Sequence, residues 1–205
     1  PSSWEEVMQR LGKKMRSNIR YYERLLDRDL QATYDLADEE NAGPALEEFL
    51  RLHAQRWRRR RLPGAIYSRR LRRFHRSVAP ALARAGYLAL HRLRAGGETI
   101  AALYCFRYGR RVFYYLGGFD PRLARYSPGT ALTAHAIRWA IGEGCQEFDF
   151  LRGREEYKYR WPVEERTNCR LEVARRGSLR AGIGLKWNSL LQRAQAAAEE
   201  AMHRA

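Results

Sequence analysis

One stretch of the chain, from Phe113 to Trp161, constrains the fold more than any other. It reads FYYLGGFDPRLARYSPGTALTAHAIRWAIGEGCQEFDFLRGREEYKYRW. An aromatic apolar run is followed by a Gly-Gly and Asp-Pro turn, an amphipathic helix that opens at Ser-Pro-Gly, and a short buried strand. A strand, a glycine-containing loop and a helix N-terminus beside a second strand form an arrangement that binds phosphate groups. The stretch therefore predicts an anion site, although Ser-Pro-Gly also simply starts helices.

The first residues of this helix are suited to such a site. Ser127 has a residue type that caps helices, and Pro128 fits the first helical position. Gly129 would let the backbone approach a ligand closely, because it has no Cβ. The hypothesis is that backbone N–H groups between Ser127 and Ala131 face a phosphate.

Three motifs in this stretch resemble the acyltransferases of the GNAT superfamily, in particular the CelD-like group associated with cellulose and exopolysaccharide biosynthesis. They are YYLGGFD at 114–120, SPGTAL at 127–132, and FDFLRG with YK and Trp at 148–161. The similarity is looser, but recognisable, from about Lys13 onward. It implies a GNAT acyl-CoA N-acyltransferase fold: an α/β protein whose central sheet is mixed, mostly antiparallel and flanked by helices.

The resemblance also implies which residues bind the donor, acetyl-CoA or another acyl-CoA. In the superfamily the pyrophosphate loop is Arg or Gln, two residues, Gly, one residue, then Gly or Ala. Gly129-Thr130-Ala131 fits the end of this pattern, whereas Arg125 lies one position too far upstream. The implied coenzyme-binding residues are Leu116, Gly117, Arg125, Ser127, Gly129, Thr130 and Ala131. The implied acceptor-binding residues are Tyr115, Gly118, Arg152 and Glu155.

Direct acyl transfer needs a base for the amine proton and an acid for the leaving thiolate. Asp149 lies between Phe148 and Phe150, so these aromatics should turn its carboxylate to the opposite face of the strand. It is then either a general base or a structural carboxylate paired with Arg152 or Lys158. By resemblance, Tyr157 protonates the thiolate, with Tyr159 too close to exclude. Lys158 points to a phosphate or to Asp149, and Glu155 is a minority candidate for the base.

The rest of the chain alternates between helical and strand periodicity. The spacing of apolar residues predicts helices over 3–29, 43–59, 66–85, 127–142 and 185–204. It predicts strands over 31–37, 87–94, 98–108, 111–117, 147–151 and 167–174. In the helix over 66–85, Tyr67, Leu71, Phe74, Val78 and Leu82 should face inward, and Pro80 should bend or break it. His91 is predicted to be a packed or solvated strand histidine rather than a catalytic one.

Composition limits the remaining possibilities. The net charge of +16 is typical of proteins that bind an anionic partner. Only four of the 39 basic residues are lysines, however, so a general preference for arginine in the composition, with these side chains solvated, is the favoured explanation. The three cysteines show no metal-ligand spacing, so we expect reduced core thiols and no metal.

Residues 1–205 should form a single domain with end helices at 1–30 and 185–205. The chain begins at Pro1, so we expect it to be a piece of a longer protein. It shows neither an apolar run of membrane-spanning length nor a signal peptide.

The leading hypothesis is a cytoplasmic acyl-CoA-dependent N-acyltransferase. Its acceptor would be an amine of an amino sugar, an amino acid or a cell-surface polysaccharide precursor. One alternative within the fold is an aminoacyl-tRNA-dependent transferase of the Fem type, with tRNA as the partner. The other is a non-catalytic, basic nucleic-acid-binding or scaffold domain.

Overall fold

A five-stranded sheet forms the centre of the computed structural model, which describes residues 2–59, 61–62, 64–169, 171, 173, 183–184 and 186–192. The strands lie side by side in chain order: β1 (Thr33–Leu36), β2 (Leu88–Ala95), β3 (Glu98–Tyr108), β4 (Arg111–Phe119) and β5 (Glu147–Asp149). Neighbouring strands are antiparallel except for β4 and β5, which are parallel. This confirms the predicted α/β class with a mixed, mostly antiparallel sheet.

Glycine turns fix the order of the three central strands. Gly96 and Gly97 join β2 to β3 with φ angles of 56° and 80°. Two successive residues with positive φ form the tight turn whose twist matches that of a hairpin. Gly109, with φ 58°, opens the turn between β3 and β4 in the same way. The predicted antiparallel meander is therefore confirmed.

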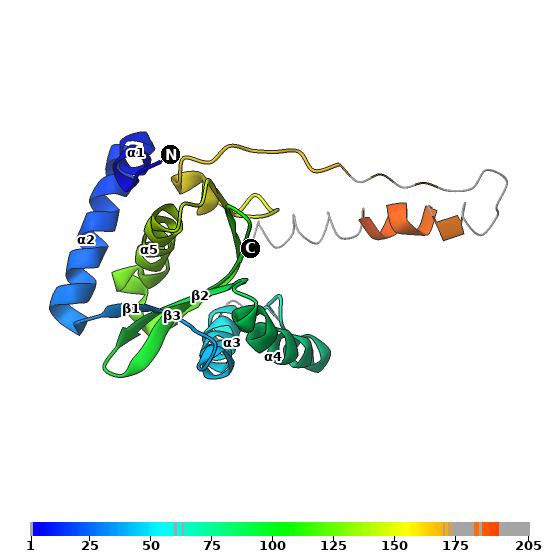
Figure 1. The fold of residues 1–205 in the computed structure, drawn as a ribbon, viewed down its shortest axis with the longest axis horizontal. Helices are drawn as coiled ribbons and strands as arrows, with labels where there is room; N and C mark the ends of the chain where they lie inside the picture. The colour runs from blue at the N-terminus through cyan, green and yellow to red at the C-terminus, as the bar shows by residue number, and fades with distance from the viewer. Residues whose placement is uncertain are drawn as a thin grey trace. The chain divides into compact units, whose positions relative to one another are not determined.

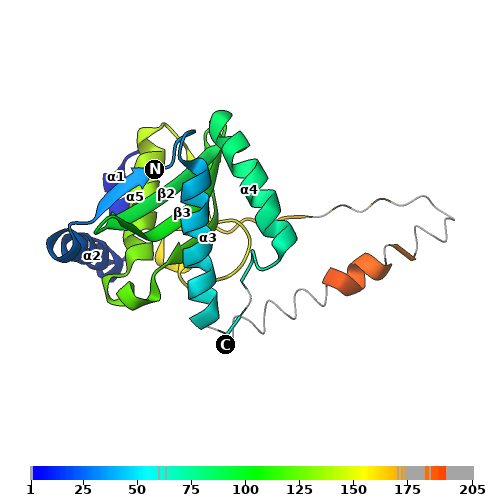
Figure 2. The same cartoon turned by 90° about the horizontal axis from the view of Figure 1, so that it is seen from below.

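Helices cover both faces of the sheet (Figures 1 and 2). On one face lie α1 (Trp4–Arg10), α2 (Lys13–Leu30) and α5 (Pro128–Gly142). On the other lie α3 (Ala42–Arg59) and α4 (Arg69–Arg84). Two short 3-10 helices, Pro121–Tyr126 (η1) and Lys158–Arg160 (η2), precede α5 and follow β5. Each face of the sheet thus has its own apolar core.

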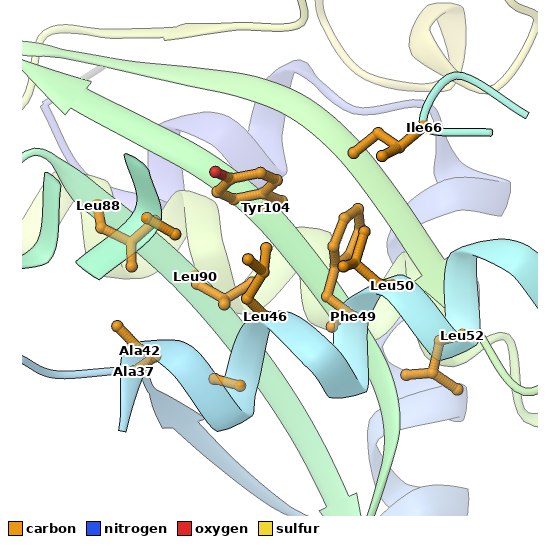
Figure 3. Close-up of a cluster of buried hydrophobic side chains, with 13 residues drawn as sticks. Ala37, Ala42, Leu46, Phe49, Leu50, Leu52, Ile66, Leu88, Leu90 and Tyr104 are labelled. Carbon is orange, nitrogen blue, oxygen red and sulfur yellow. The ribbon is translucent and has the colours of Figure 1, made fainter. Parts of the chain in front are cut away.

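The core beneath α3 is built from large side chains that lose all contact with water. Leu46 and Phe49 of α3 point toward Leu90 of β2 and Tyr104 of β3 (Figure 3). All four are 0% exposed. Burying each of the aliphatic or phenyl side chains contributes about 1.5–3 kcal/mol, so this cluster is a main source of stability.

The opposite core joins α1 and α2 to α5. Val7 and Ile19 pack with Ala134 and Ile137, and Trp161 closes the cluster. Arg138 of α5 makes two hydrogen bonds to the carboxylate of Glu23 on α2, at 2.6 and 3.1 Å. On this face His91 is fully buried, with its ring 4.9 Å from that of Trp139. His91 is thus packed, one of the two predicted environments, and its lack of a catalytic role stays a prediction.

The predicted helix over 3–29 is wrong in one respect, because it is divided into α1 and α2. Leu11 and Gly12 are both extended, with ψ angles of 144° and 148°. Arg16 donates from Nη1 to three carbonyl oxygens at the end of α1. These bonds satisfy carbonyl groups that the interruption leaves without helical partners. The predicted cap at Ser3 is confirmed, since its Oγ accepts from the Glu6 amide at 3.2 Å.

The predicted inward face of α4 is wrong over its N-terminal half. His75 and Ala79 are buried, whereas Tyr67 and Phe74 are 61% and 58% exposed. The cause is Tyr104, whose hydroxyl lies 3.3 Å from Nδ1 of His75 beneath the helix. A small residue at position 79 then lets α4 approach the sheet. The helix also continues through Pro80, so the predicted break is wrong, and the bend at this residue stays a prediction.

The described chain divides into two units. The first comprises Pro1–Arg154 and Arg160–Pro162, and the second comprises Glu155–Tyr159 and Val163–Ala205. In the second unit, residues 183–184 and 186–192 are helical, and the remainder of the predicted helix over 185–204 lies outside the described residues. The strand predicted over 167–174 is wrong for the described residues 167–169, 171 and 173. Cys105 and Cys145 are buried thiols, but Cys169 is exposed, so the core prediction fails there. The single-domain organisation stays a prediction.

The backbone of α3 approaches the sheet closely at Gly118 of β4. A Cβ at this position would lie 2.6 Å from the backbone nitrogen of His53 and 3.0 Å from the carbonyl carbon of Leu52. Backbone atoms cannot move aside as the end of a side chain can. Gly118 is therefore required by packing.

We predict that Gly118→Ala lowers the free energy of unfolding by about 1–3 kcal/mol or more, because it overpacks the contact between α3 and β4. The matched control is Gly43→Ala on α3, where a Cβ would meet nothing within 4 Å. The control should be neutral or slightly stabilising, since alanine favours helix. Chemical denaturation measures both. Equal stability of the two variants would contradict the close approach.

Candidate active site

The parallel pairing between β4 and β5 is short, and β4 extends beyond the paired region. Three pairs of residues lie opposite one another, ending with Phe113 and Asp149. β4 continues to Phe119, whereas β5 stops at Asp149. No strand among the described residues pairs with the outer edge of β4 beyond Phe113. Unpaired backbone groups at such an edge can accept an extended ligand as an additional strand.

Two local features separate the strands at this point. Between Tyr104 and Cys105 the register of β3 with β4 shifts, which leaves Tyr115 as an extra residue in β4. Such a bulge bends the strand and re-aims its side chains. After β5, the amide of Leu151 donates to Oδ1 of Asp149 at 2.6 Å, and Leu151 has a positive φ of 57°. The chain therefore turns away from β4 immediately after Asp149.

Asp149 lies on the face of the sheet that α3 and α4 cover. Phe148 and Phe150 form an aromatic group with Tyr114 on the opposite face, which confirms the predicted orientation of these two rings. Since side chains alternate along a strand, the Asp149 carboxylate points to the other side. It fixes the loop, as one interpretation predicted, although its partner is the Leu151 amide rather than Arg152 or Lys158. Its role as a base stays a prediction.

Tyr115 lies on the same face and links β4 to α4. Its ring is 5.7 Å from that of His75 and 5.8 Å from that of Tyr104, and the residue is 37% exposed. Burial lowers the pKa of His75 and raises that of Tyr104, so both are neutral near neutral pH. The sequence indicated Tyr115 but not His75, whose helical position suggested an outward side chain.

The start of α5 differs in detail from the predicted cap. Ser127 is left-handed, with φ 45° and ψ 50°, and its side chain makes no capping hydrogen bond. Its carbonyl instead accepts from the amides of Thr130, at 2.9 Å, and Ala131, at 3.2 Å. Pro128 has no N–H group. Among the described residues, the amide of Gly129 is therefore the first N–H group of α5, and it donates no hydrogen bond. The Ser127 hydroxyl does not cap the helix.

Gly129 is not required by packing. The nearest atom to a Cβ built there is Cδ1 of Phe119 at 3.7 Å, an ordinary van der Waals distance, and its φ is not left-handed. The absence of a side chain leaves the positive end of the α5 dipole accessible. These features fit the pyrophosphate of coenzyme A, for which Gly129 N–H and the Ser127 hydroxyl are the donors that the chain offers.

Two arginines near this end of the sheet were missed in the sequence. Arg56 lies over the ring of Phe119, 5.4 Å from its centroid, and its Nη1 is 3.4 Å from the carbonyl oxygen of Gly117. Arg59 donates to the carbonyl of Pro121 at 3.0 Å. Both belong to the last turns of α3, and only their place in a basic run at a helix end could have indicated them. They add positive charge beside the segment that precedes α5.

The other predicted residues are placed as follows. Leu116 packs against the core beneath α3, and Gly117 lies under the Tyr114 hydroxyl, with which a Cβ at this position would clash. Arg125 is exposed and donates to the hydroxyl of Tyr126 at 2.6 Å. Arg152 is exposed in the turn that follows β5.

Three predicted residues belong to the second unit. There the ammonium of Lys158 forms an ion pair with the Glu155 carboxylate at 2.7 Å, and Lys158 is buried. Tyr157 is half-buried in the same segment. The functional roles assigned to Glu155, Tyr157 and Lys158 stay predictions.

Within the described ranges, no group of three or more His, Cys, Asp or Glu side chains could hold a metal ion. In the same residues, no helix is both long enough and apolar enough to cross a bilayer.

A model of a known protein family decides the classification. It describes an acetyltransferase (GNAT) domain and matches residues 13–159, well over half of the chain. The chain belongs to the GNAT acetyltransferase family. GNAT acetyltransferases use acyl-CoA as the donor and an amine as the acceptor. A search of curated proteins found no match.

Solved structures agree with the GNAT fold. The crystal structure of FemX is similar with a TM-score of 0.56 and 13% identity, covering 72% of this chain and 50% of FemX. An aminoglycoside acetyltransferase from an uncultured soil metagenomic sample, in complex with sisomicin, has a TM-score of 0.52 and 13% identity. That alignment covers 73% of this chain and 99% of the acetyltransferase. The chain thus spans half the length of FemX, and at this identity both likenesses show the fold alone.

We predict that Asp149→Asn preserves the fold and lowers acyl transfer about a hundred- to ten-thousand-fold, as the loss of a general base does. Asparagine retains an Oδ1 that can accept from the Leu151 amide, so this variant removes the charge but not the turn. Asp149→Ala removes both and should also lower the melting temperature. The measurements are a melting curve and acetyl-CoA consumption with an amine identified from a panel of acceptors. Full activity of Asp149→Asn would eliminate Asp149 as the base.

Proposed function

We propose that this GNAT domain is an acyl-CoA-dependent N-acyltransferase of the CelD-like group. The observation that carries the proposal is the parallel pair β4–β5, which ends at Phe113 and Asp149 while β4 continues beside the start of α5. The pantetheine arm would pair with the free edge of β4. The pyrophosphate would lie at Gly129, where the helix dipole and an unbonded amide favour negative charge.

The thioester supplies an activated acyl group. Asp149 would take a proton from the acceptor amine, which then forms an amide bond as the carbon–sulfur bond breaks. A backbone N–H at the free edge of β4 would stabilise the negative charge on the carbonyl oxygen. By resemblance, Tyr157 would return a proton to the sulfur, yielding the free thiol of coenzyme A. Most of the rate enhancement would come from holding the two reactants together.

The proposed acceptor is an amine of an amino sugar, an amino acid or a cell-surface polysaccharide precursor, and the proposed location is the cytoplasm. Support for this face as the acceptor side comes from Tyr115, which is partly exposed beside His75 on the same face as Asp149. The similarity to FemX supports a second candidate, a Fem-type transferase that uses aminoacyl-tRNA. It rests on fold similarity over half of FemX.

We predict that acetyl-CoA and free coenzyme A both raise the melting temperature of the wild-type chain. A ligand at about a hundred-fold over its dissociation constant stabilises the native state by about 2.7 kcal/mol. Gly129→Val should abolish this shift, because the added side chain would obstruct the approach to the α5 amides. The matched control is Gly142→Val at the other end of α5, where a Cβ would meet nothing within 4 Å.

The control should melt at the wild-type temperature or slightly higher without ligand, because valine has a higher helix propensity than glycine, and it should retain the full shift. A non-catalytic scaffold would respond to neither ligand. If the wild type does not respond, or if both valine variants respond alike, the coenzyme assignment at Gly129 is wrong.

A further inference from the structure

The N-terminal half of α4 and the segment just before it expose an apolar stripe. Tyr67, Leu71 and Phe74 are 61%, 38% and 58% exposed. Leu71 and Phe74 are three residues apart and lie on one side of the helix, and Tyr67 comes directly before its N-cap residue, Ser68. α4 lies at the outside of the first unit, beside α3 (Figure 2). The apolar residues that the amphipathic pattern predicted to face inward over this part of the chain therefore lie on a solvent-exposed surface.

Arginines flank this stripe without any acidic residue on the helix. The sequence of α4 is RRLRRFHRSVAPALAR, with no Asp or Glu. Arg69, Arg70 and Arg73 are exposed. In the part of the chain that the structure describes, Arg76 is the only arginine of α4 in an ion pair, with Glu47 of α3 at 2.6 Å. An apolar line between exposed cations is the pattern of a helix that lies in the plane of a membrane interface.

We propose that α4 docks on an anionic lipid surface. Tyr67, Leu71 and Phe74 would enter the region between headgroups and acyl chains, while the arginines extend to the phosphates. A second copy of the chain fits poorly, because its own α4 would bring the same positive charges into contact. Nucleic acid fits less well, because Leu71 separates the two rings and cannot stack on a base.

The proposal does not depend on acyl transfer. It concerns a face of α4, whereas the coenzyme site is assigned to β4 and the start of α5. Membrane binding and the coenzyme-dependent melting shift can therefore fail separately. Docking would hold the domain at a bilayer, which suits an acceptor amine carried by an amphiphilic precursor.

The test is sedimentation of the whole 205-residue chain with lipid vesicles. One set contains phosphatidylcholine only, and in the other part of it is replaced by phosphatidylglycerol. The wild type should bind the anionic vesicles and be released by salt. The double variant Leu71→Ser with Phe74→Ser should bind about ten-fold or more weakly, because two apolar side chains no longer enter the lipid. Arg69→Gln, Arg70→Gln and Arg73→Gln should each weaken binding to the anionic vesicles about five-fold.

The matched control is Tyr21→Ser, which removes another aromatic residue, 51% exposed on α2 among arginines. It should bind like the wild type. A cooperative melting transition of every variant without ligand shows that the fold is intact. Unchanged vesicle binding by the double variant overturns the proposal. So does a result in which the double variant loses tRNA binding but not vesicle binding, because the surface would then serve nucleic acid.

Discussion

The interruption of pairing between β4 and β5 is the feature on which the function of this structure depends. The two strands share three residue pairs and then separate. A bulge at Tyr115 bends one strand, and the hydrogen bond from the Leu151 amide to Asp149 turns the other away. Because parallel strands need a crossover, α5 must run back along the sheet, so its N-terminus lies at the end where the strands diverge. A free strand edge and a positive helix end are thus brought together by chain connectivity.

The α3 helix holds this arrangement in place. It touches β4 at Gly118, where only a glycine allows its backbone to approach, and its core side chains bury against Tyr104 and Leu90. At its last turns, Arg56 covers Phe119 and Arg59 bonds to Pro121. The helix therefore positions the segment that leads from β4 into α5 and also adds positive charge to it. One element serves both the stability of the sheet and the electrostatics of the proposed coenzyme site.

Much of the fold could be predicted because local patterns agreed with it. Glycine turns such as Gly96-Gly97 specify the meander, and the run from Ser127 specifies α5. Predictions failed where tertiary contacts decide between local options. The N-terminal helix is interrupted at Leu11 and Gly12, where Arg16 donates to the carbonyl groups at the end of α1. His75 of α4 faces inward, where its ring lies beside the Tyr104 hydroxyl. Motifs in the sequence predicted candidate site residues on loops, whereas Arg56 and Arg59 were missed because only the fold brings α3 to β4.

The most direct test of the central claim is backbone amide hydrogen exchange of the whole chain with and without coenzyme A. If the ligand extends the sheet at β4 and places its pyrophosphate on α5, exchange should slow at Tyr114–Phe119 and at Gly129. The amides of β1 and of β2, which β3 separates from β4, should be unaffected. Protection that is absent from both β4 and the start of α5, or that appears only in other elements, would contradict the account.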